Sequence, residues 1–508
     1  MAQVLPFNGF YTGNSEKNSA RTCVNYMPIR HDAGALSEYT LESTTGISLH
    51  PSESFSRDPG DMVSSVFEWS GNLSAFQWDV CGVYEGGFLV TASGGSYDVI
   101  DLLIDTPTID KVRVSYNHDI VLIVDEIGAS NVQQSIYSYQ ASTDTVTLTD
   151  ISAQLGANVR LTDTVYFGSR FLLMSTIQSG VNKGRVYYSD IEDPTSYDTL
   201  GFFKSLSQTH DNIGMYLLNE RLYLFTNNDF TVWINTPDVN LPFSQQKGSA
   251  GTVGLVSTDS ACKVGNKLYI VGKEVSALGL YVFGSGGAEK ISTEYIDQSI
   301  KDTLDAFVFY FSDNGRDFVG FTCGALGRVA TYCYDLQTGE FHTRSTNGGA
   351  WNVRGSGTNT EGQNIFYGDS SVLDSGSDYF AQIGRGRSNI GTEFGYQVER
   401  EMVTSPFNSD GVTNNVRELA FQTDIDYSSL TPVTLPNLSL SVSENFGKTF
   451  EAERLESFDA DGENTKILRY MNIGFFRQAF VFKLKTSTIY PHKILKMLTR
   501  LEKGFRQI

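Results

Sequence analysis

The histidines and cysteines of this 508-residue chain have no spacing that predicts metal or nucleophilic chemistry. The six histidines form neither an H-x-H nor an H-E-x-x-H pattern, so no pair is placed to share a metal ion. The five cysteines are scattered, odd in number and without a C-x-x-C pair. This pattern predicts reduced thiols in a protein made in a cytosol, and it excludes a disulfide scaffold and a zinc ribbon.

The glycine-rich segments do not predict a nucleophile or a phosphate site either. Ser356 lies in a partial G-x-S-x-G match with no strand-to-helix turn around it. Residues 284–290 are rich in glycine but connect two predicted strands, and no G-x-x-x-x-G-K-[ST] sequence occurs. We therefore predict no catalytic, cofactor-binding or metal-binding residues, no cofactor and no enzyme activity.

Two polar segments resemble known loops more closely. Residues 187–197 (YYSDIEDPTSY) contain Asp190, Glu192 and Asp193, but they lack the glycine and the final glutamate of an EF-hand, so we interpret them as a structured connection. Residues 443–450 (SENFGKTF) are similar to the S-x-D-x-G-x-T-W Asp-box of sialidases and other propellers. In that motif a short polar side chain caps a hairpin and glycine adopts positive φ, so it predicts a hairpin and not glycosidase activity.

The charge of the chain is distributed unevenly. Residues 466–508 contain ten Lys and Arg and one acid, a net charge of +9, whereas residues 1–465 contain 28 bases and 57 acids, a net charge of −29. An acidic body would repel phosphate, so it would not wrap nucleic acid tightly, although DNA could slide past it. The basic end predicts an interface with an acidic partner, a neighbouring copy or DNA phosphate. Its candidate residues are Arg477, Lys483, Lys485, Lys493, Lys496 and Arg500.

A simpler interpretation of these six bases is a half-buried strand with a solvated face. Residues 475–485 alternate apolar and basic side chains, with Phe476, Phe480 and Phe482 on one face and Lys483 and Lys485 on the other. Under this interpretation each base needs no partner. No apolar run reaches 18 residues, so we expect no membrane-spanning helix, and the start lacks the pattern of a signal peptide.

The elements that must position these residues are predicted to be strands. The chain has 48 glycines, 59 Phe and Tyr, and 19 % charged residues, a composition typical of sheets with tight turns. Helical periodicity appears only at residues 294–307 and, ambiguously, at 491–501.

Six turn-plus-apolar units recur along the middle of the chain. They occupy residues 119–124, 170–174, 221–225, 267–271, 317–321 and 364–367, and their starts lie 51, 51, 46, 50 and 47 residues apart. A possible earlier member is 87–90. A period of 40–50 residues with several strands per unit predicts a β-propeller, here of six or seven blades, although such a spacing can arise by chance in an all-β chain.

The repeat ends near residue 385. Residues 1–55 are irregular and polar and predict an N-terminal arm, residues 56–390 the propeller, and residues 391–508 a β-sandwich-like domain that carries the basic terminal segment. Long strands are expected at 419–426, 437–443 and 475–485. The predicted fold is therefore all-β.

Three segments resemble the tail-hub proteins of short-tailed bacteriophages, also called packaged-DNA stabilisation or head-completion proteins. They are residues 21–28 (RTCVNYMP), the ordered series YYSDIEDP, DNIG, LYLF, TVW and KGSAGT within 187–260, and the end segments 443–450 and 469–483. The middle series is the most specific, and together they cover about a quarter of the chain. Phe475 and Phe476 depart from the family pattern, which has a more basic stretch there.

The resemblance implies a non-enzymatic component of the virion tail, assembled in the host cytoplasm. It implies a homohexameric ring below the portal–adaptor ring that extends the DNA channel, retains packaged DNA, holds a needle or plug and mounts tailspikes or fibres. DNA would pass through such a ring without sequence-specific binding. The alternatives are a carbohydrate-active or carbohydrate-binding propeller and a propeller scaffold for cytosolic complexes.

Overall fold

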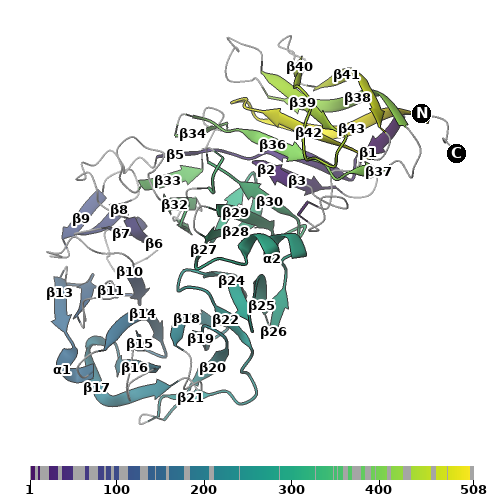
Figure 1. Cartoon of the computed structure of the whole chain (residues 1–508). Coiled ribbons are helices and arrows are strands. Elements are labelled where there is room, and N and C mark those ends of the chain that lie inside the picture. The colour runs from purple at the N-terminus through teal and green to yellow at the C-terminus, as the bar shows by residue number, and fades with distance from the viewer. Residues whose placement is uncertain are drawn as a thin grey trace.

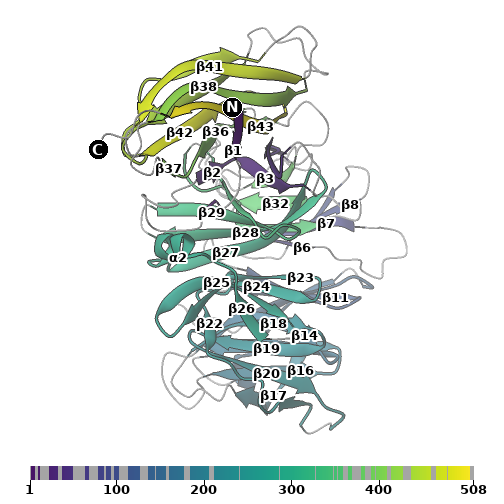
Figure 2. The same cartoon turned by 90° about the vertical axis from the view of Figure 1, so that its right-hand side faces the viewer.

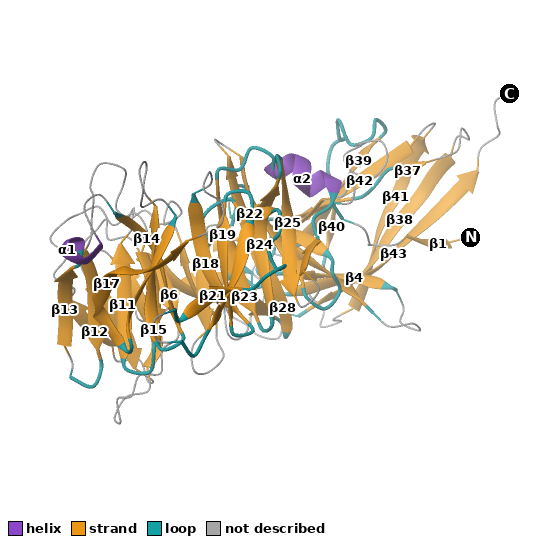
Figure 3. Ribbon diagram, turned by 90° about the horizontal axis from the view of Figure 1, so that it is seen from below, coloured by secondary structure: helices purple, strands orange, loops and turns teal. Residues whose placement is uncertain are grey.

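The computed structural model describes residues 2–5, 10–11, 22–31, 37–49, 63–67, 78–84, 87–92, 97–101, 112–125, 135–143, 145–155, 159–176, 184–204, 211–238, 241–284, 287–325, 328–346, 348–351, 353–358, 364–368, 379–383, 391–394, 396–408, 414–426, 436–458, 465–476 and 479–503. These residues form 43 strands and two short helices, α1 (Ser152–Leu155) and α2 (Glu294–Ile300). Figure 3 shows how strongly strands dominate. Neither described helix has the length and apolar character that a membrane crossing needs.

Seven antiparallel sheets follow one another along the chain and circle one axis, as Figure 1 shows. Neighbouring blades touch mainly through their first strands, and the first strand of blade 7 touches that of blade 1, which closes the ring. The predicted β-propeller is thus confirmed, with seven blades.

The first four blades have four strands each. Blade 1 contains β6 (Val63–Phe67), β7 (Trp78–Tyr84), β8 (Gly87–Ala92) and β9 (Tyr97–Asp101); blade 2 contains β10 (Val112–Tyr116), β11 (Ile120–Asp125), β12 (Ser135–Gln140) and β13 (Thr145–Asp150); blade 3 contains β14 (Arg160–Phe167), β15 (Arg170–Thr176), β16 (Arg185–Asp190) and β17 (Asp193–Lys204); blade 4 contains β18 (Asn212–Leu218), β19 (Arg221–Thr226), β20 (Phe230–Asn235) and β21 (Phe243–Gln245).

The last three blades are less uniform. Blade 5 contains β22 (Val253–Leu255), β23 (Ala261–Val264), β24 (Lys267–Glu274), β25 (Ala277–Gly284) and β26 (Gly287–Lys290); blade 6 contains β27 (Asp305–Asp313), β28 (Arg316–Ala325), β29 (Arg328–Asp335) and β30 (Phe341–Arg344); blade 7 contains β31 (Gly355–Thr358), β32 (Asn364–Gly368), β33 (Tyr379–Ile383) and, from the N-terminal part of the chain, β5 (Ile47–Leu49).

The six repeated units are the second strands, in sheet order, of blades 2 to 7; in blade 5 this is β24, because β22 and β23 both pair with it. A second strand is buried on both faces, because each of its faces packs on a neighbouring blade. In β15, Phe171 and Leu173 belong to the cluster shared with blade 2, whereas Leu172 and Met174 belong to the one shared with blade 4. Burial on both sides explains the uninterrupted apolar runs. The possible earlier unit at 87–90 is the third strand of blade 1, which explains its irregular spacing.

The propeller and the C-terminal strands are joined by one continuous sheet. Its order is β27-β28-β29-β30-β2-β36-β42-β39-β40, so blade 6 continues into the C-terminal part through β2 (Thr22–Val24). β2 runs parallel to β30 and antiparallel to β36 (Arg400–Val403). The other members are β42 (Ala479–Thr486), β39 (Asn437–Ser443) and β40 (Arg454–Ser457), and β37 (Phe407–Asn408) pairs with β42.

A second sheet completes a sandwich at the end of the molecule away from the propeller (Figure 2). Its order is β3 (Tyr26–Arg30), β4 (Tyr39–Ser43), β43 (His492–Lys503), β38 (Asn414–Ile425) and β41 (Thr465–Phe476), and β1 (Ala2–Leu5) pairs with β43. The two sheets meet in an aromatic core, where the ring centres of Phe421 in β38 and Phe482 in β42 lie 5.8 Å apart. The short hairpin β34 (Thr392–Glu393) and β35 (Tyr396–Gln397) precedes the sandwich.

The N-terminal strands are divided among three sheets. β1, β3 and β4 extend the sandwich, β2 joins the sandwich to blade 6, and β5 adds the outermost strand to blade 7 by pairing Ile47 with Ile383. Residues 55 and 390, the predicted domain boundaries, lie outside the described residues, so the division into 1–55, 56–390 and 391–508 stays a prediction.

Two predicted elements are wrong, and the ambiguous segment at 491–501 is a strand. The helix expected over 294–307 ends at Ile300, because Leu304 is exposed and Phe307 already belongs to β27. Residues 492–501 belong to strand β43 rather than a helix: Ile494, Met497, Leu498 and Leu501 fit a helical spacing, but the segment pairs along its length with β38. The single strand expected over 475–485 is two strands in different sheets, β41 ending at Phe476 and β42 beginning at Ala479; the ring centres of Phe476 and Phe480 lie 4.9 Å apart.

The Asp-box-like turn is a side-chain-capped hairpin, as predicted. The Ser443 hydroxyl accepts the Gly447 N–H at 3.0 Å, and the Asn445 side-chain oxygen accepts the Thr449 N–H at 2.9 Å. Phe446 and Gly447 both have positive φ. These bonds satisfy the turn internally, which fits a structural role.

Candidate functional site

The six predicted interface bases do not lie on one surface. Lys483 and Lys485 project from β42, and Lys493, Lys496 and Arg500 from β43, which belongs to the opposite sheet of the sandwich. Arg477 lies outside the described residues. The structure therefore divides the described bases into two groups. Their role as an interface stays a prediction.

Three of these bases already have partners within the chain. Lys485 forms an ion pair with Glu399, and the Lys493 ammonium lies 2.9 Å from a carboxylate oxygen of Glu42. The Lys483 ammonium lies 4.7 Å from the centre of the Phe450 ring. Such half-exposed pairs contribute about 0–1 kcal/mol each to stability. These bases are thus engaged locally.

Lys496 and Arg500 lie instead on the surface of the sandwich that faces away from the propeller. The strand register places them in rows with the neighbouring strands: Lys496 with Gln422 and Ile467, Leu498 with Ala420 and Arg469, and Arg500 with Glu418 and Met471. Phe475 lies in the next row, beyond a shift in register where Asn472 and Ile473 of β41 lie opposite a single residue of β38. We call this surface the outer face; it comprises Ile467, Met471, Phe475, Leu498, Lys496 and Arg500.

A second group of positive charges is buried where the propeller meets the sandwich. Arg344, at the end of β30, forms an ion pair with Asp313 of β27 and donates to the Thr45 carbonyl at 3.0 Å. Its guanidinium lies 4.5 Å from the centre of the Trp351 ring. Arg344 and Asp313 are 1 % and 0 % exposed. The pair therefore fixes the segment that immediately precedes β5.

Arg400, at the start of β36, holds the same segment from the sandwich side. It donates to the carbonyls of Thr44 at 3.1 Å, Thr488 at 2.8 Å and Val398 at 3.2 Å. It is fully buried, and burial lowers the pKa of its guanidinium to about 10, which leaves it protonated at neutral pH. Three carbonyl acceptors thus stabilise its charge in place of an ion pair.

A buried histidine lies beside Arg400. The Tyr26 hydroxyl and His492 Nε2 are 2.8 Å apart, and His492 Nδ1 lies 3.1 Å from the Tyr490 carbonyl. An N–H on Nδ1 can donate to that carbonyl, so Nε2 accepts from Tyr26. Burial, together with the charge of Arg400, lowers the pKa of His492 to about 3, so it is neutral at physiological pH.

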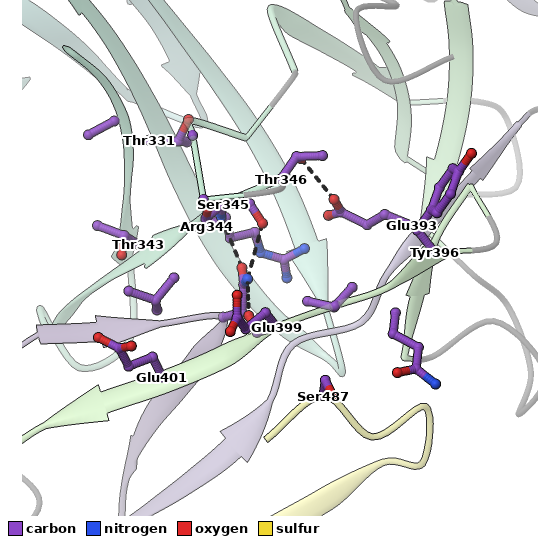
Figure 4. Close-up of a pocket in the computed structure, with 17 residues that line it drawn as sticks. Thr331, Thr343, Arg344, Ser345, Thr346, Glu393, Tyr396, Glu399, Glu401 and Ser487 are labelled. Atoms are coloured by element: carbon purple, nitrogen blue, oxygen red, sulfur yellow. Dashed lines mark hydrogen bonds between the residues drawn. The ribbon is translucent and has the colours of Figure 1, made fainter. Parts of the chain in front are cut away.

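A pocket of about 640 Å³ opens beside this junction and is shown in Figure 4. Its wall includes Arg344, Glu393, Glu399, Glu401 and the half-exposed ring of Tyr396. Glu393 accepts a hydrogen bond from the Thr346 hydroxyl at 2.8 Å, and burial raises its pKa. Because Arg344 is neutralised by Asp313 and Glu399 by Lys485, the pocket is at most weakly acidic.

Charged side chains also connect the inner strands of the propeller. Arg113 of blade 2 lies 2.7 Å from Asp259 of blade 5. Asp163 of blade 3 accepts the backbone N–H of Met215 in blade 4 at 2.7 Å. Burial raises the pKa of Asp163 to about 6, although Arg113 and the bound N–H groups oppose the shift. These contacts cross blade boundaries and stabilise the ring.

A groove of about 860 Å³ between blades 4 and 5 bears on the carbohydrate alternative. Its wall includes Tyr223, Phe230, Tyr281 and Phe283. Phe230, Tyr281 and Phe283 are buried, and Phe230 packs on Phe283 at 5.1 Å and on Tyr223 at 5.9 Å. Rings packed on one another do not offer an open stacking platform for a sugar, so the groove does not favour a glycan site.

The acidic stretch with Asp190, Glu192 and Asp193 forms a tight turn between β16 and β17. Asp190 accepts from the Ser196 hydroxyl at 2.7 Å, Asp193 from the Thr195 hydroxyl at 2.7 Å, and Glu192 from the Asn117 amide at 2.6 Å. Within the described part of the chain no three His, Cys, Asp or Glu side chains are grouped so as to hold a metal ion. The turn is a structured connection, as predicted.

Most of the outer face and both buried arginines are not among the residues predicted from the sequence. Ile467, Arg469 and Met471 alternate with Leu468 and Tyr470, a pattern typical of a strand with one exposed face, but the register shift at 472–473 breaks the pattern before Phe475. Arg344 and Arg400 had no sequence signal, because only the fold brings them to Thr44 and Thr45 from opposite sides.

Comparison with known proteins identifies the family. A family model of phage stabilisation proteins, described as Bacteriophage P22 Gp10, beta-propeller, matches residues 3–309. No curated protein sequence matches the chain. The matched segment contains the N-terminal strands, blades 1 to 5 and the start of blade 6.

Two solved structures show only distant likeness. An exo-beta-1,3-galactanase from Phanerochaete chrysosporium, solved with galactose, is 12 % identical and is matched over 77 % of this chain and 95 % of that one, with a TM-score of 0.27. The beta-propeller domain of the Trilobed protease from Pyrococcus furiosus is 11 % identical and is matched over 64 % of this chain and 96 % of that one, with a TM-score of 0.36. Neither likeness supports an argument about function.

The family match includes two of the three segments that suggested the resemblance, those at 21–28 and within 187–260. It extends over more than half of the chain, and it names the same fold that the seven blades display. The chain therefore belongs to the phage stabilisation family of the bacteriophage P22 Gp10 β-propeller.

Proposed function

We propose that this protein is a non-enzymatic tail hub of a phage virion, assembled in the host cytoplasm. In this role copies form a homohexameric ring that binds the portal–adaptor ring and extends its DNA channel. The ring retains packaged DNA, holds a needle or plug at its far end and mounts tailspikes or fibres on its wall. DNA passes through it without sequence-specific contacts.

The observation that carries this proposal is the continuous sheet from blade 6 to the sandwich. A ring that holds DNA under pressure needs subunits whose domains do not move apart under load. Here the domains share a β-ladder, a crossing N-terminal segment and the buried Arg344–Asp313 pair. A flexible linker would not transmit force between subunits in this way.

The charge of the chain supports the same role. The net charge of −29 over residues 1–465 disfavours tight binding of phosphate, which would slow DNA in transit. Lys496 and Arg500, which have no ion pair among the described residues, can meet an acidic neighbour.

The test is negative-stain microscopy of the purified chain, alone and mixed with the portal–adaptor complex of its phage. Sixfold rings, or a ring that caps the adaptor, support the proposal. Dispersed single particles under both conditions contradict it. A screen for glycan hydrolysis and glycan binding would then test the carbohydrate alternative. If the protein were such an enzyme, substitution of a carboxylate in its pocket should abolish the activity.

A further inference from the structure

The outer face of the sandwich combines exposed apolar side chains on adjacent strands. Met471 is 55 % and Phe475 67 % exposed, Ile467 is also exposed, and Leu498 is half-buried beside them. Exposed apolar side chains gathered on one sheet typically mark a surface that another protein covers. The edge of β41 is less available, because Arg454 donates to the carbonyls of Met471 and Asn472 at 3.2 and 3.0 Å.

The charge of the outer face is positive and not neutralised locally. Two acids in the rows of Arg500 and Phe475 are already paired: Glu418 with Arg469, and Glu502 with Arg417 at 2.6 Å. Lys496 and Arg500 have no ion pair among the described residues. The surface therefore presents apolar side chains together with two available cations, which fits an acidic surface with an apolar centre.

The turn between β16 and β17 in blade 3 has the complementary character. It consists of Asp190, Ile191, Glu192 and Asp193, and we call it the acidic turn. Ile191 is 62 % exposed at its tip. None of the three carboxylates has an ion pair in the part of the chain that the structure describes.

The acidic turn is also held in one conformation before any partner binds. Glu192 has a φ of 57°, its N–H donates to the Ser169 carbonyl at 2.9 Å, and its carboxylate accepts from Asn117 and Tyr166. Asp190 and Asp193 are fixed by Ser196 and Thr195. A preformed turn loses little conformational entropy on binding, so more of its contact energy appears as affinity.

One copy cannot bring these two surfaces together. In Figures 1 and 2 the outer face, on β38, β41 and β43, lies at one end of the molecule and β16 and β17 lie at the other. A contact between them must join two copies through different surfaces. Such a head-to-tail contact repeats around a closed ring when the rotation between copies closes.

We propose that the outer face of one copy binds the acidic turn of the next copy. Ile191 inserts among Met471, Phe475 and Leu498, while Lys496 and Arg500 approach the carboxylates of the turn. This contact deepens the proposed function, on which it rests, because it identifies the surfaces that link hub subunits. DNA phosphate would meet the two cations but would leave the apolar side chains of the outer face uncovered, so it is the less suitable partner.

The test uses two full-length variants. The outer-face variant carries Met471→Asp, Phe475→Asp, Lys496→Glu and Arg500→Glu, and the turn variant carries Ile191→Lys and Asp193→Lys. All six side chains are at least partly exposed, so both variants are expected to fold, which thermal unfolding checks. A matched control carries Leu304→Asp and Lys267→Glu, at exposed sites of the propeller away from both surfaces.

Sedimentation velocity and negative-stain microscopy report assembly, under the conditions in which the wild-type chain forms rings. We expect each variant alone to remain monomeric and the control to form rings. A mixture of the two variants should give one-to-one dimers and nothing larger. The turn variant keeps a working outer face and the outer-face variant a working turn, so only one contact per pair is possible.

The remaining outcomes separate this contact from the proposed function. Rings formed by either variant alone overturn the contact but leave the hub role intact. Dimers of the turn variant by itself overturn it too, because they would show that outer faces bind one another. If the outer-face variant forms rings but no longer shifts duplex DNA, the partner is DNA. Wild-type chains that stay monomeric with and without the portal–adaptor complex overturn both proposals.

Discussion

The junction between propeller and sandwich and the outer face both contain basic residues, but these residues have opposite roles in the two regions. Arg344 and Arg400 are buried between propeller and sandwich, where Asp313 and backbone carbonyls surround them. Lys496 and Arg500 lie on the solvent side of the sandwich, and no carboxylate among the described residues pairs with them. The first pair holds one chain together, whereas the second remains available to another molecule.

The difference shows that burial, rather than charge, decides what a basic residue does. A buried ion destabilises the fold unless its hydrogen bonds are satisfied. Removing one member of a buried ion pair therefore leaves the other charge unpaired in a low-dielectric interior. An exposed ion is well hydrated and contributes little to stability, so it can be reserved for binding. Substitutions at the junction should therefore affect folding, and those on the outer face assembly.

The largest effect is expected from Arg344→Met. This change leaves Asp313 buried without its cation and frees the Thr45 carbonyl, and it should reduce the free energy of unfolding by about 3–5 kcal/mol. The midpoint of urea denaturation measures the loss. Hydrogen exchange at Ile47–Leu49 should also accelerate, because Thr45 immediately precedes the strand that completes blade 7.

Two further variants make this prediction specific. Arg344→Met combined with Asp313→Asn should recover much of the stability, since no uncompensated charge remains and the Asn oxygen can still accept the Thr45 N–H. Arg417→Met breaks a half-exposed pair with Glu502 and should cost less than about 1 kcal/mol. Equal midpoint shifts for Arg344→Met and Arg417→Met would remove the contrast between the two regions.

A smaller effect at the same junction is expected from Gly391→Ala. A Cβ on Gly391 would lie 2.2 Å from the Ile489 carbonyl oxygen, so the backbone of the sandwich must shift. Overpacking of this kind costs about 1–3 kcal/mol. Gly349→Ala, on the rim of the junction pocket, is the control, because its Cβ would meet nothing closer than 3.6 Å. A lower midpoint in the control than in Gly391→Ala would contradict the close packing.

The pH dependence of stability should reveal the neutral histidine of the junction. The pKa of His492 is lowered from its usual 6.5 to about 3, so its contribution is complete above pH 6.5 and is lost as the pH falls towards 3. Between pH 7 and pH 5 the loss should reach about 2 kcal/mol. His492→Gln keeps a donor and an acceptor but does not titrate, so the difference in free energy of unfolding between wild type and variant should shrink on acidification. A difference that stays constant between pH 7 and pH 5 would show that protonation of His492 does not cause the loss of stability.

The sequence predicted the repeated architecture better than the surfaces. Second strands buried on both faces leave uninterrupted apolar runs, so residues 170–174 could be recognised without a structure. The closure of blade 7 by β5 and the bridge through β2 could not be predicted, because they pair strands more than 300 residues apart and the pairing leaves no local pattern.

The basic end of the chain shows why the available interface residues could not be predicted from the sequence. Removal of residues 466–508 would delete the segment with a net charge of +9. It would also delete β42, β43 and nearly all of β41, which belong to the two sandwich sheets, so it would remove the sandwich together with the charge. Which of Lys483, Lys485, Lys493, Lys496 and Arg500 are available depends on strand pairing, and strand pairing is not visible in the composition.

The smallest effect on stability, and the sharpest distinction between the two regions, is expected from Lys496→Ala with Arg500→Ala. Each change should alter the free energy of unfolding by no more than about 0.5 kcal/mol, because neither base has an ion pair among the described residues. Ring assembly should nevertheless weaken, and it should lose most of its dependence on salt, since exposed charges are screened over about 8–10 Å at ordinary ionic strength. Lys493→Ala is the matched control: its partner Glu42 belongs to the same chain, so it should leave both assembly and its salt dependence unchanged. Sedimentation velocity at low and high salt measures both quantities. If the double variant and the control depend equally on salt, the positive charge of the outer face is not used between copies.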